Sequence, residues 1–84
     1  MTFTYVDSRL WKYSFSINEG DLFIEVISMD EAGHQVHREF VSIQDGSLRW
    51  MHYHTRDDDP LVSEEARHFC EKSVNSFIKL KAFW

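Results

Sequence analysis

The chain has 84 residues, of which 43% are hydrophobic and 15% aromatic, and its formal net charge is −5. This length supports one hydrophobic core, so we expect a single domain over residues 1–84. The apolar content is high enough that we expect the chain to fold and not to be disordered. The acidic balance disfavours direct nucleic-acid binding, and no run of about 20 apolar residues predicts a membrane span or a membrane partner. The single cysteine, Cys70, excludes an intramolecular disulfide and fits a reducing compartment, so we expect a cytoplasmic location.

The clearest strand covers residues 11–17, where aromatic or aliphatic side chains alternate with polar ones. A turn follows at Glu19-Gly20, and a two-residue loop there fixes the pairing with a second strand over residues 22–29. The predicted pairs are Ile17 with Leu22, Phe15 with Ile24 and Tyr13 with Val26. Both apolar sets then share one face of the sheet.

Two further turns, around Gly33 and Asp45-Gly46, bound a third strand over residues 35–43 and a fourth from Leu48 to about His54. The last hairpin pairs Ile43 with Leu48 and Val41 with Trp50. In the hairpin around Gly33, a two-residue loop would set Phe23 opposite Phe40 and Glu25 opposite Arg38. A bulged loop would shift every one of these partners.

A helix is predicted to begin after Ser63, because this N-cap residue is followed by Glu64 and Glu65 in the first turn. Its apolar stripe comprises Ala66, Phe69, Cys70, Ser73, Val74, Phe77 and Leu80. The predicted fold is therefore α+β: a four-stranded antiparallel β-meander with one C-terminal α-helix packed on one face, in the order ββββα.

Histidines form one candidate site, since the predicted register places His37 opposite His54 and Glu39 opposite His52. Zinc accepts imidazole and carboxylate ligands, which makes a metal- or small-ligand-binding domain one alternative function. The other interpretation is that these are ordinary polar residues at an uncovered rim of the sheet. We favour that interpretation and expect no cofactor.

Catalytic motifs are absent from the sequence, which contains no nucleophile elbow, no Gly-rich phosphate loop and no HExxH pattern. Cys70 belongs to the apolar stripe of the helix, where a thiol behaves as a small hydrophobic side chain. His68 lies two residues away and points in another direction, so the two do not form a nucleophile and base pair. We expect a protein that is not an enzyme.

Carboxylates define a second candidate site, where exposed acids would bind a partner protein by imitating nucleic-acid phosphates. The residues are Asp57, Asp58, Asp59, Glu64, Glu65, Asp30 and Glu31. The alternative is that these acids serve only solvation and the dipole of the helix.

The sheet face opposite the helix is a third candidate, because aromatic, Met and Arg side chains are enriched at protein interfaces. The proposed contact residues are Phe23, Phe40, Met51, Tyr53, Arg38 and Arg49. This face could bind a partner, a second copy in a homodimer, or single-stranded nucleic acid, although the net charge argues against the last. Alternatively, residues 3–6 or 83–84 fold over it.

No family motif can be quoted from this chain residue by residue. Small size, acidity and the lack of a catalytic signature are shared with phage-encoded inhibitors of host defence, immunity proteins and adaptor subunits. This is an analogy between types of protein and not a resemblance in sequence. Our leading hypothesis is a non-enzymatic inhibitor or regulator that occludes a basic, nucleic-acid-binding surface on a partner, such as a nucleic-acid-handling host protein.

Overall fold

The computed structural model describes residues 1–18, 23–44, 47–50 and 61–82. Of residues 77–82, at the end of the helix, it describes the backbone only. Its elements are β1 (Thr2–Val6), β2 (Lys12–Asn18), β3 (Phe23–Met29), β4 (Gln35–Gln44), β5 (Ser47–Arg49) and α1 (Glu64–Ala82). The strands form one antiparallel sheet in the order β1-β2-β3-β4-β5. The predicted α+β class, a meander with a C-terminal helix packed against it, is confirmed, and β1 is an additional strand.

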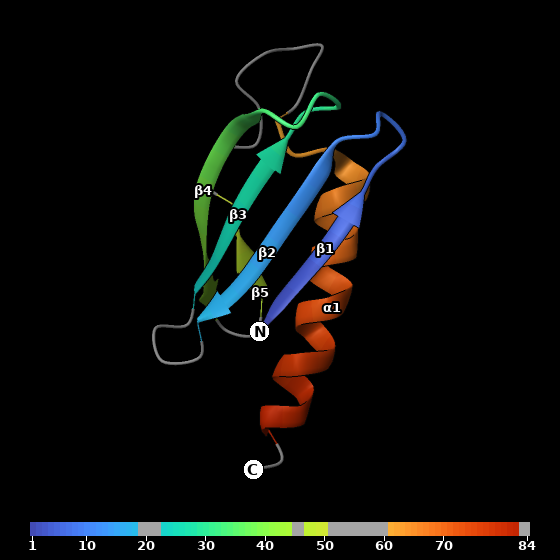
Figure 1. Ribbon diagram of the computed structural model, residues 1–84. Coiled ribbons are helices and arrows are strands. Elements are labelled where there is room, and N and C mark those ends of the chain that lie inside the picture. The colour runs from blue at the N-terminus through green and yellow to red at the C-terminus, as the bar shows by residue number, and fades with distance from the viewer. Residues whose placement is uncertain (19–22, 45–46, 51–60, 83–84) are drawn as a thin grey trace.

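The sheet curls into a half-barrel, and α1 lies along its concave side beside β1 (Figure 1). The helix contacts both edges of the sheet, β1 and β5, and so closes over the core. Fully buried core side chains come from alternate positions of the strands, as the period-two pattern requires, and from one stripe of the helix. They include Tyr13, Phe15, Ile24, Val26, Val41, Ala66, Cys70 and Val74.

The start of the helix matches the prediction in detail. The Ser63 Oγ accepts a hydrogen bond from the Ala66 backbone N–H at 3.2 Å, and the Ser63 carbonyl accepts the first helical bond from Arg67 at 3.0 Å. Ser63 is therefore the N-cap, which satisfies one of the donors that a helix leaves without an intrahelical partner. Of the predicted stripe, the side chains beyond residue 76 lie outside the described part of the structure.

The predicted register of the first hairpin is wrong by two residues. Ile17 pairs with Ile24, and Phe15 pairs with Val26, because Asn18 and Phe23 are the last partners and four residues connect them. An offset of two preserves which side chains share a face, since side chains alternate with a period of two. The predicted core face is therefore retained despite the wrong partners.

In the second hairpin the two-residue loop is also wrong, and the bulged alternative holds, with a register shift between Ser28 and Met29. Phe23 lies opposite Ser42, not opposite Phe40, again an offset of two that keeps the faces. In the last hairpin, Ile43 pairs with Leu48 as predicted. The strand β5 ends at Arg49; Trp50 is buried but lies outside the strand, and residues 51–54 of the predicted strand lie outside the described residues.

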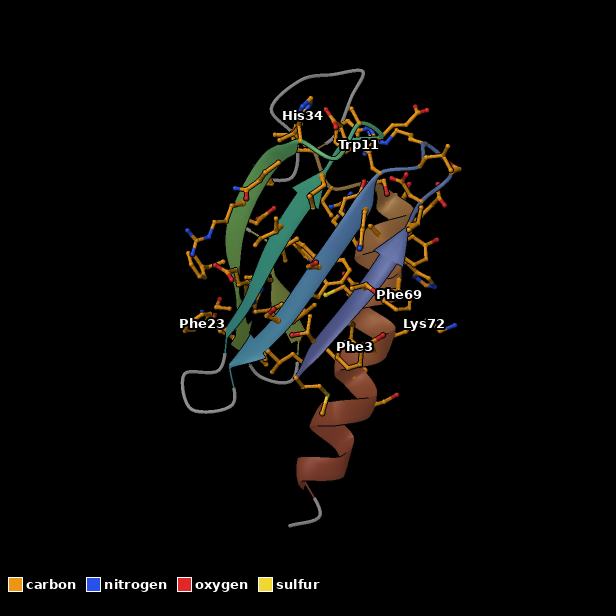
Figure 2. All side chains as sticks on the ribbon, in the orientation of Figure 1. Phe3, Trp11, Phe23, His34, Phe69 and Lys72 are labelled. Carbon is orange, nitrogen blue, oxygen red and sulfur yellow. The ribbon has the colours of Figure 1, made fainter. Side chains whose placement is uncertain are left out.

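The N-terminal segment does not fold over the outer face of the sheet. It forms the edge strand β1, in which Phe3 pairs with Phe15 and Tyr5 with Tyr13. Phe3 and Phe69 lie in the layer between β1 and α1 (Figure 2), and the Tyr5 ring stacks on Phe69 at 4.8 Å. Residues 83–84, the other predicted cover, lie outside the described residues.

Across the described part of the chain, no helix has the length and apolar character needed to cross a membrane.

Candidate functional site

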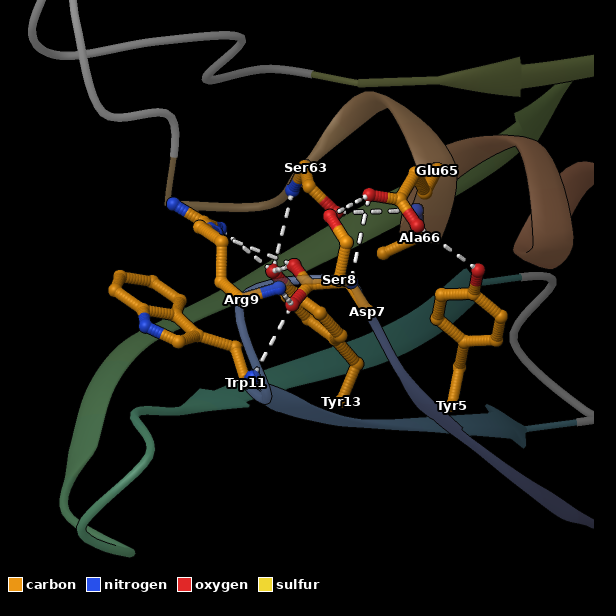
Figure 3. A network of polar contacts seen from close by, with 9 residues as sticks. All are labelled: Tyr5, Asp7, Ser8, Arg9, Trp11, Tyr13, Ser63, Glu65 and Ala66. Carbon is orange, nitrogen blue, oxygen red and sulfur yellow. Dashed lines mark hydrogen bonds and ion pairs between the residues drawn. The ribbon is translucent and has the colours of Figure 1, made fainter.

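The turn between β1 and β2 is built around Asp7, whose side chain is fully buried (Figure 3). Its Oδ1 accepts the backbone N–H groups of Arg9 at 2.9 Å and Trp11 at 3.1 Å. Its Oδ2 accepts the Tyr13 hydroxyl at 2.5 Å and the Arg9 Nε–H at 3.3 Å. Burial raises the pKa of Asp7, but hydrogen bonds, led by that of Tyr13, outweigh burial and leave the pKa lowered. This carboxylate holds the turn in one conformation.

The same network fastens the turn to the start of the helix. The Ser8 hydroxyl donates to Glu65 Oε1 at 2.6 Å, and the Tyr5 hydroxyl donates to Glu65 Oε2 at 3.3 Å. The Ser63 backbone N–H donates to the Tyr13 oxygen at 3.4 Å. Glu65, which the sequence suggested as a partner-binding acid, is therefore engaged within the protein itself.

At the tip of this rigid turn, Leu10 has a positive φ of 68° and is 60% exposed. The left-handed region is a genuine outlier for a bulky residue and favours glycine. The Leu10 N–H donates to the Asp7 carbonyl at 3.0 Å, which closes the turn. Beside it, the Arg9 guanidinium lies 3.8 Å from the centre of the Trp11 ring. The tip thus presents an apolar side chain next to a cation and an aromatic ring.

The acidic candidates that the structure describes gather at this end of the molecule. The turn between β3 and β4 carries Asp30 and Glu31, and Glu64 begins α1 at the same end, where Trp11 and His34 also lie (Figures 1 and 2). Asp30 caps its own turn by accepting the His34 backbone N–H at 2.9 Å. Glu31 and Glu64 are exposed. The candidates Asp57, Asp58 and Asp59 lie outside the described residues.

The outer face of the sheet carries a small aromatic and charged cluster. The Phe23 and Phe40 rings meet edge to face at 5.4 Å, and Phe40 is 47% exposed. The Arg38 guanidinium lies 5.2 Å from the Phe40 ring centre and pairs with the Glu25 carboxylate. Arg49 is exposed on the same face, as the partner of Ser42. The other two candidates for this face, Met51 and Tyr53, lie outside the described residues.

His37 and Glu39 lie together on the concave, helix-facing side of β4. The His37 Nε2 is 3.0 Å from the Glu39 Oε1, and their side chains are 14% and 3% exposed. The register that placed His52 and His54 opposite them is confirmed as far as Arg49, but both histidines lie outside the described residues. Within the ranges that the structure describes, no three His, Cys, Asp or Glu side chains form a metal-binding group.

Cys70 is buried on the helix stripe, as the sequence predicted. Burial, with a smaller contribution from Glu71, raises the pKa of its thiol to about 12. The thiolate, the nucleophilic form, is therefore scarce at neutral pH. The neighbouring His68 is exposed and does not share this environment.

Sequence reasoning missed the most organised part of the molecule, the turn from Asp7 to Tyr13. Asp followed by Ser in front of a predicted strand was a signal for a turn closed by the Asp side chain. The missing element was β1, without which no hairpin was expected there.

Scans against models of known protein families and searches of curated proteins and of solved structures found no match for this chain.

Proposed function

We propose that this chain is a non-enzymatic protein-binding domain, an inhibitor or regulator that occludes a basic, nucleic-acid-binding surface of a partner protein. The observation that carries the proposal is Leu10, an exposed apolar side chain held in a backbone conformation that favours glycine. A left-handed conformation costs a residue with a side chain about 1–2 kcal/mol. Strained residues of this kind persist where the surrounding structure fixes them, and they cluster at sites of ligand binding.

Rigidity of the tip supports this interpretation. Asp7 fixes the turn through two backbone N–H groups, and Ser8 is bound to Glu65 of the helix. A contact residue on a rigid turn loses little conformational freedom when a partner binds, so more of its contact energy contributes to affinity. Leu10 would be the apolar contact at the centre of such an interface.

Charge supports a basic partner. Glu31 and Glu64 are exposed at the end of the molecule that carries Leu10, and the whole chain has a net charge of −5. Complementary potentials accelerate association and select partners of opposite charge. The binding of a basic protein surface is therefore expected to weaken as the salt concentration rises.

A second candidate function uses the outer face of the sheet. The Phe23 and Phe40 pair could stack with bases, and the exposed Arg38 and Arg49 could contact phosphates of a single strand. The net charge of −5 opposes this function at long range. A labelled oligonucleotide titrated at low salt separates the two candidates, because only the second predicts binding that Phe40→Ala abolishes.

The test of the leading proposal starts from a partner isolated with the tagged chain and then purified. Its affinity is measured by calorimetry for wild type, Leu10→Gly and Leu10→Asn. Both variants fit a positive φ, so we expect an unfolding free energy higher than that of wild type by roughly 0.5–1 kcal/mol. We also expect binding to weaken at least tenfold, the equivalent of about 1.4 kcal/mol. Unchanged affinity in both variants would contradict the role of Leu10.

The electrostatic part has its own matched pair of variants. Glu31→Gln with Glu64→Gln changes the net charge by the same amount as Asn75→Lys with Ser76→Lys, two exposed positions further along α1. We expect the first pair to weaken binding and to flatten its salt dependence, and the second pair to change both less. Equal effects would show that only the overall charge matters and that the acidic end is not the contact surface.

A further inference from the structure

A second buried carboxylate, Glu39, lies far from the Asp7 turn in the sequence and has a different environment. Its Oε1 lies 3.0 Å from the His37 Nε2, and its Oε2 has no hydrogen-bond partner among the described residues. Ser28 pairs with His37 across the two strands, so their side chains share the concave face. The buried Ser28 Oγ also lacks a partner there. Two buried oxygen atoms beside His37 therefore have no hydrogen-bond partner among the described residues.

Such an arrangement is costly unless another group completes it. A buried polar atom without a partner costs roughly 1–3 kcal/mol, and more if it is charged. Most buried polar groups in folded proteins are accordingly paired. A buried carboxylate oxygen with no partner among the described residues, next to an imidazole, forms a pair of side chains that can bind a metal cation.

We propose that His37 and Glu39 bind a divalent transition-metal ion of the zinc class. Zinc binds imidazole nitrogen and carboxylate oxygen at about 2.0–2.2 Å, so two ligand atoms of one tetrahedral ion lie about 3.3–3.6 Å apart. The observed 3.0 Å between Nε2 and Oε1 needs only a few tenths of an ångström of widening. The unpartnered Oε2 and the Ser28 hydroxyl lie on the same face, where they can bind the ion or its water.

The donor types select the class of ion. Ca²⁺ requires six to eight oxygen ligands and Mg²⁺ an octahedral oxygen shell, whereas an imidazole suits zinc and its neighbours in the first transition row. His37 and Glu39 supply two of the three or four protein ligands that zinc sites have, and the remaining positions would take a further protein donor or water. This proposal is independent of the partner-binding role and holds or fails separately from it.

The test is zinc titration of the complete chain after removal of bound metal with a chelator, using zinc chloride alone as the probe. We expect wild type to bind one zinc ion, and Glu39→Gln and His37→Gln each to weaken binding at least tenfold, since loss even of groups behind the ligands costs 10–100-fold. The matched control is His34→Gln, which removes an exposed histidine 3.8 Å from the Asp30 carboxylate. We expect the control to bind zinc like wild type.

Three outcomes would overturn the proposal. Wild type that binds no zinc contradicts it directly, and zinc binding that survives both substitutions shows that the ion lies elsewhere on the chain. An NMR measurement on wild type alone keeps the proposal testable if the variants fail to fold. Zinc should shift the imidazole nitrogen resonances of His37 in NMR spectra and leave those of His34 in place; the opposite pattern also overturns the proposal.

Discussion

Asp7 and Glu39 are two buried carboxylates of the same small core, and their surroundings are opposite. Asp7 accepts hydrogen bonds from two backbone N–H groups, a tyrosine hydroxyl and a guanidinium. Among the described residues, Glu39 has one hydrogen-bond partner, the imidazole of His37, and one oxygen without a partner. The fold supplies several donors to the first carboxylate, whereas the described residues leave one oxygen of the second without a partner.

The difference follows from where the partners lie along the chain. The donors Arg9, Trp11 and Tyr13 belong to the six residues that follow Asp7 in the sequence, and Ser63 at the start of the helix adds a further hydrogen bond. Glu39 lies on the strand β4, where side chains on one face occur at every second residue and backbone groups are used by the ladder. A local turn can therefore gather several donors around one buried charge, which a position in the middle of a strand does not do by itself.

The largest effect is expected when Asp7 is neutralised. In Asp7→Asn, one oxygen becomes an N–H group that faces the donors of Tyr13 and Arg9, so at least one buried donor loses its acceptor. Hydrogen bonds to a charged group are worth roughly 1.5–3 kcal/mol, and breaking a buried pair costs roughly 3–5 kcal/mol. We expect a loss of about 3 kcal/mol in the free energy of unfolding, measured by urea denaturation. A loss below about 1 kcal/mol would place Asp7 in the same class as Glu39.

Lowering the pH should test whether the ionised form of the same carboxylate is the stabilising one. The lowered pKa of Asp7 means that the folded protein favours the ionised form more than the unfolded chain does. Its contribution is complete above the unfolded value of 3.8 and is lost as the pH falls from there through the folded pKa. Urea denaturation from pH 6 to pH 2 should show the stability difference between wild type and Asp7→Asn shrinking below about pH 4. A constant difference would show that ionisation of Asp7 does not matter.

The fold was predictable because patterns of period two and the Ser63 cap survive local errors. Two hairpins had the wrong partners, yet each offset was two residues, so Phe15 and Val41 still faced the core as expected. The site was less predictable. The backbone strain at Leu10 depends on the strand β1, which the sequence analysis did not predict. The unpartnered oxygen of Glu39 depends on which donors the folded chain brings near it, and the described residues bring none. Charge patterns mark acids, but they do not show which carboxylates the fold completes.

Neutralising Glu39 should change the free energy of unfolding of the metal-free protein least. It is also the most informative of these substitutions. Glu39→Gln keeps the size of the side chain and removes a charge that has a single hydrogen-bond partner among the described residues, so we expect little loss of folding free energy. Replacing an incompletely paired buried ion is often neutral or stabilising, and we expect a change within about 1 kcal/mol, towards higher stability. The measurement is urea denaturation in the presence of a chelator, repeated with zinc.

With zinc, the order of stability should reverse, because a ligand that binds only the folded state stabilises it and the variant has lost a ligand. A Glu39→Gln variant that loses about 3 kcal/mol in chelator, as expected for Asp7→Asn, would show that the carboxylate already has its partners without metal. The contrast between the two acids would then disappear, and with it the physical reason for placing a cation beside His37. A small change in chelator followed by the reversal in zinc would instead tie the incompleteness of Glu39 to metal binding.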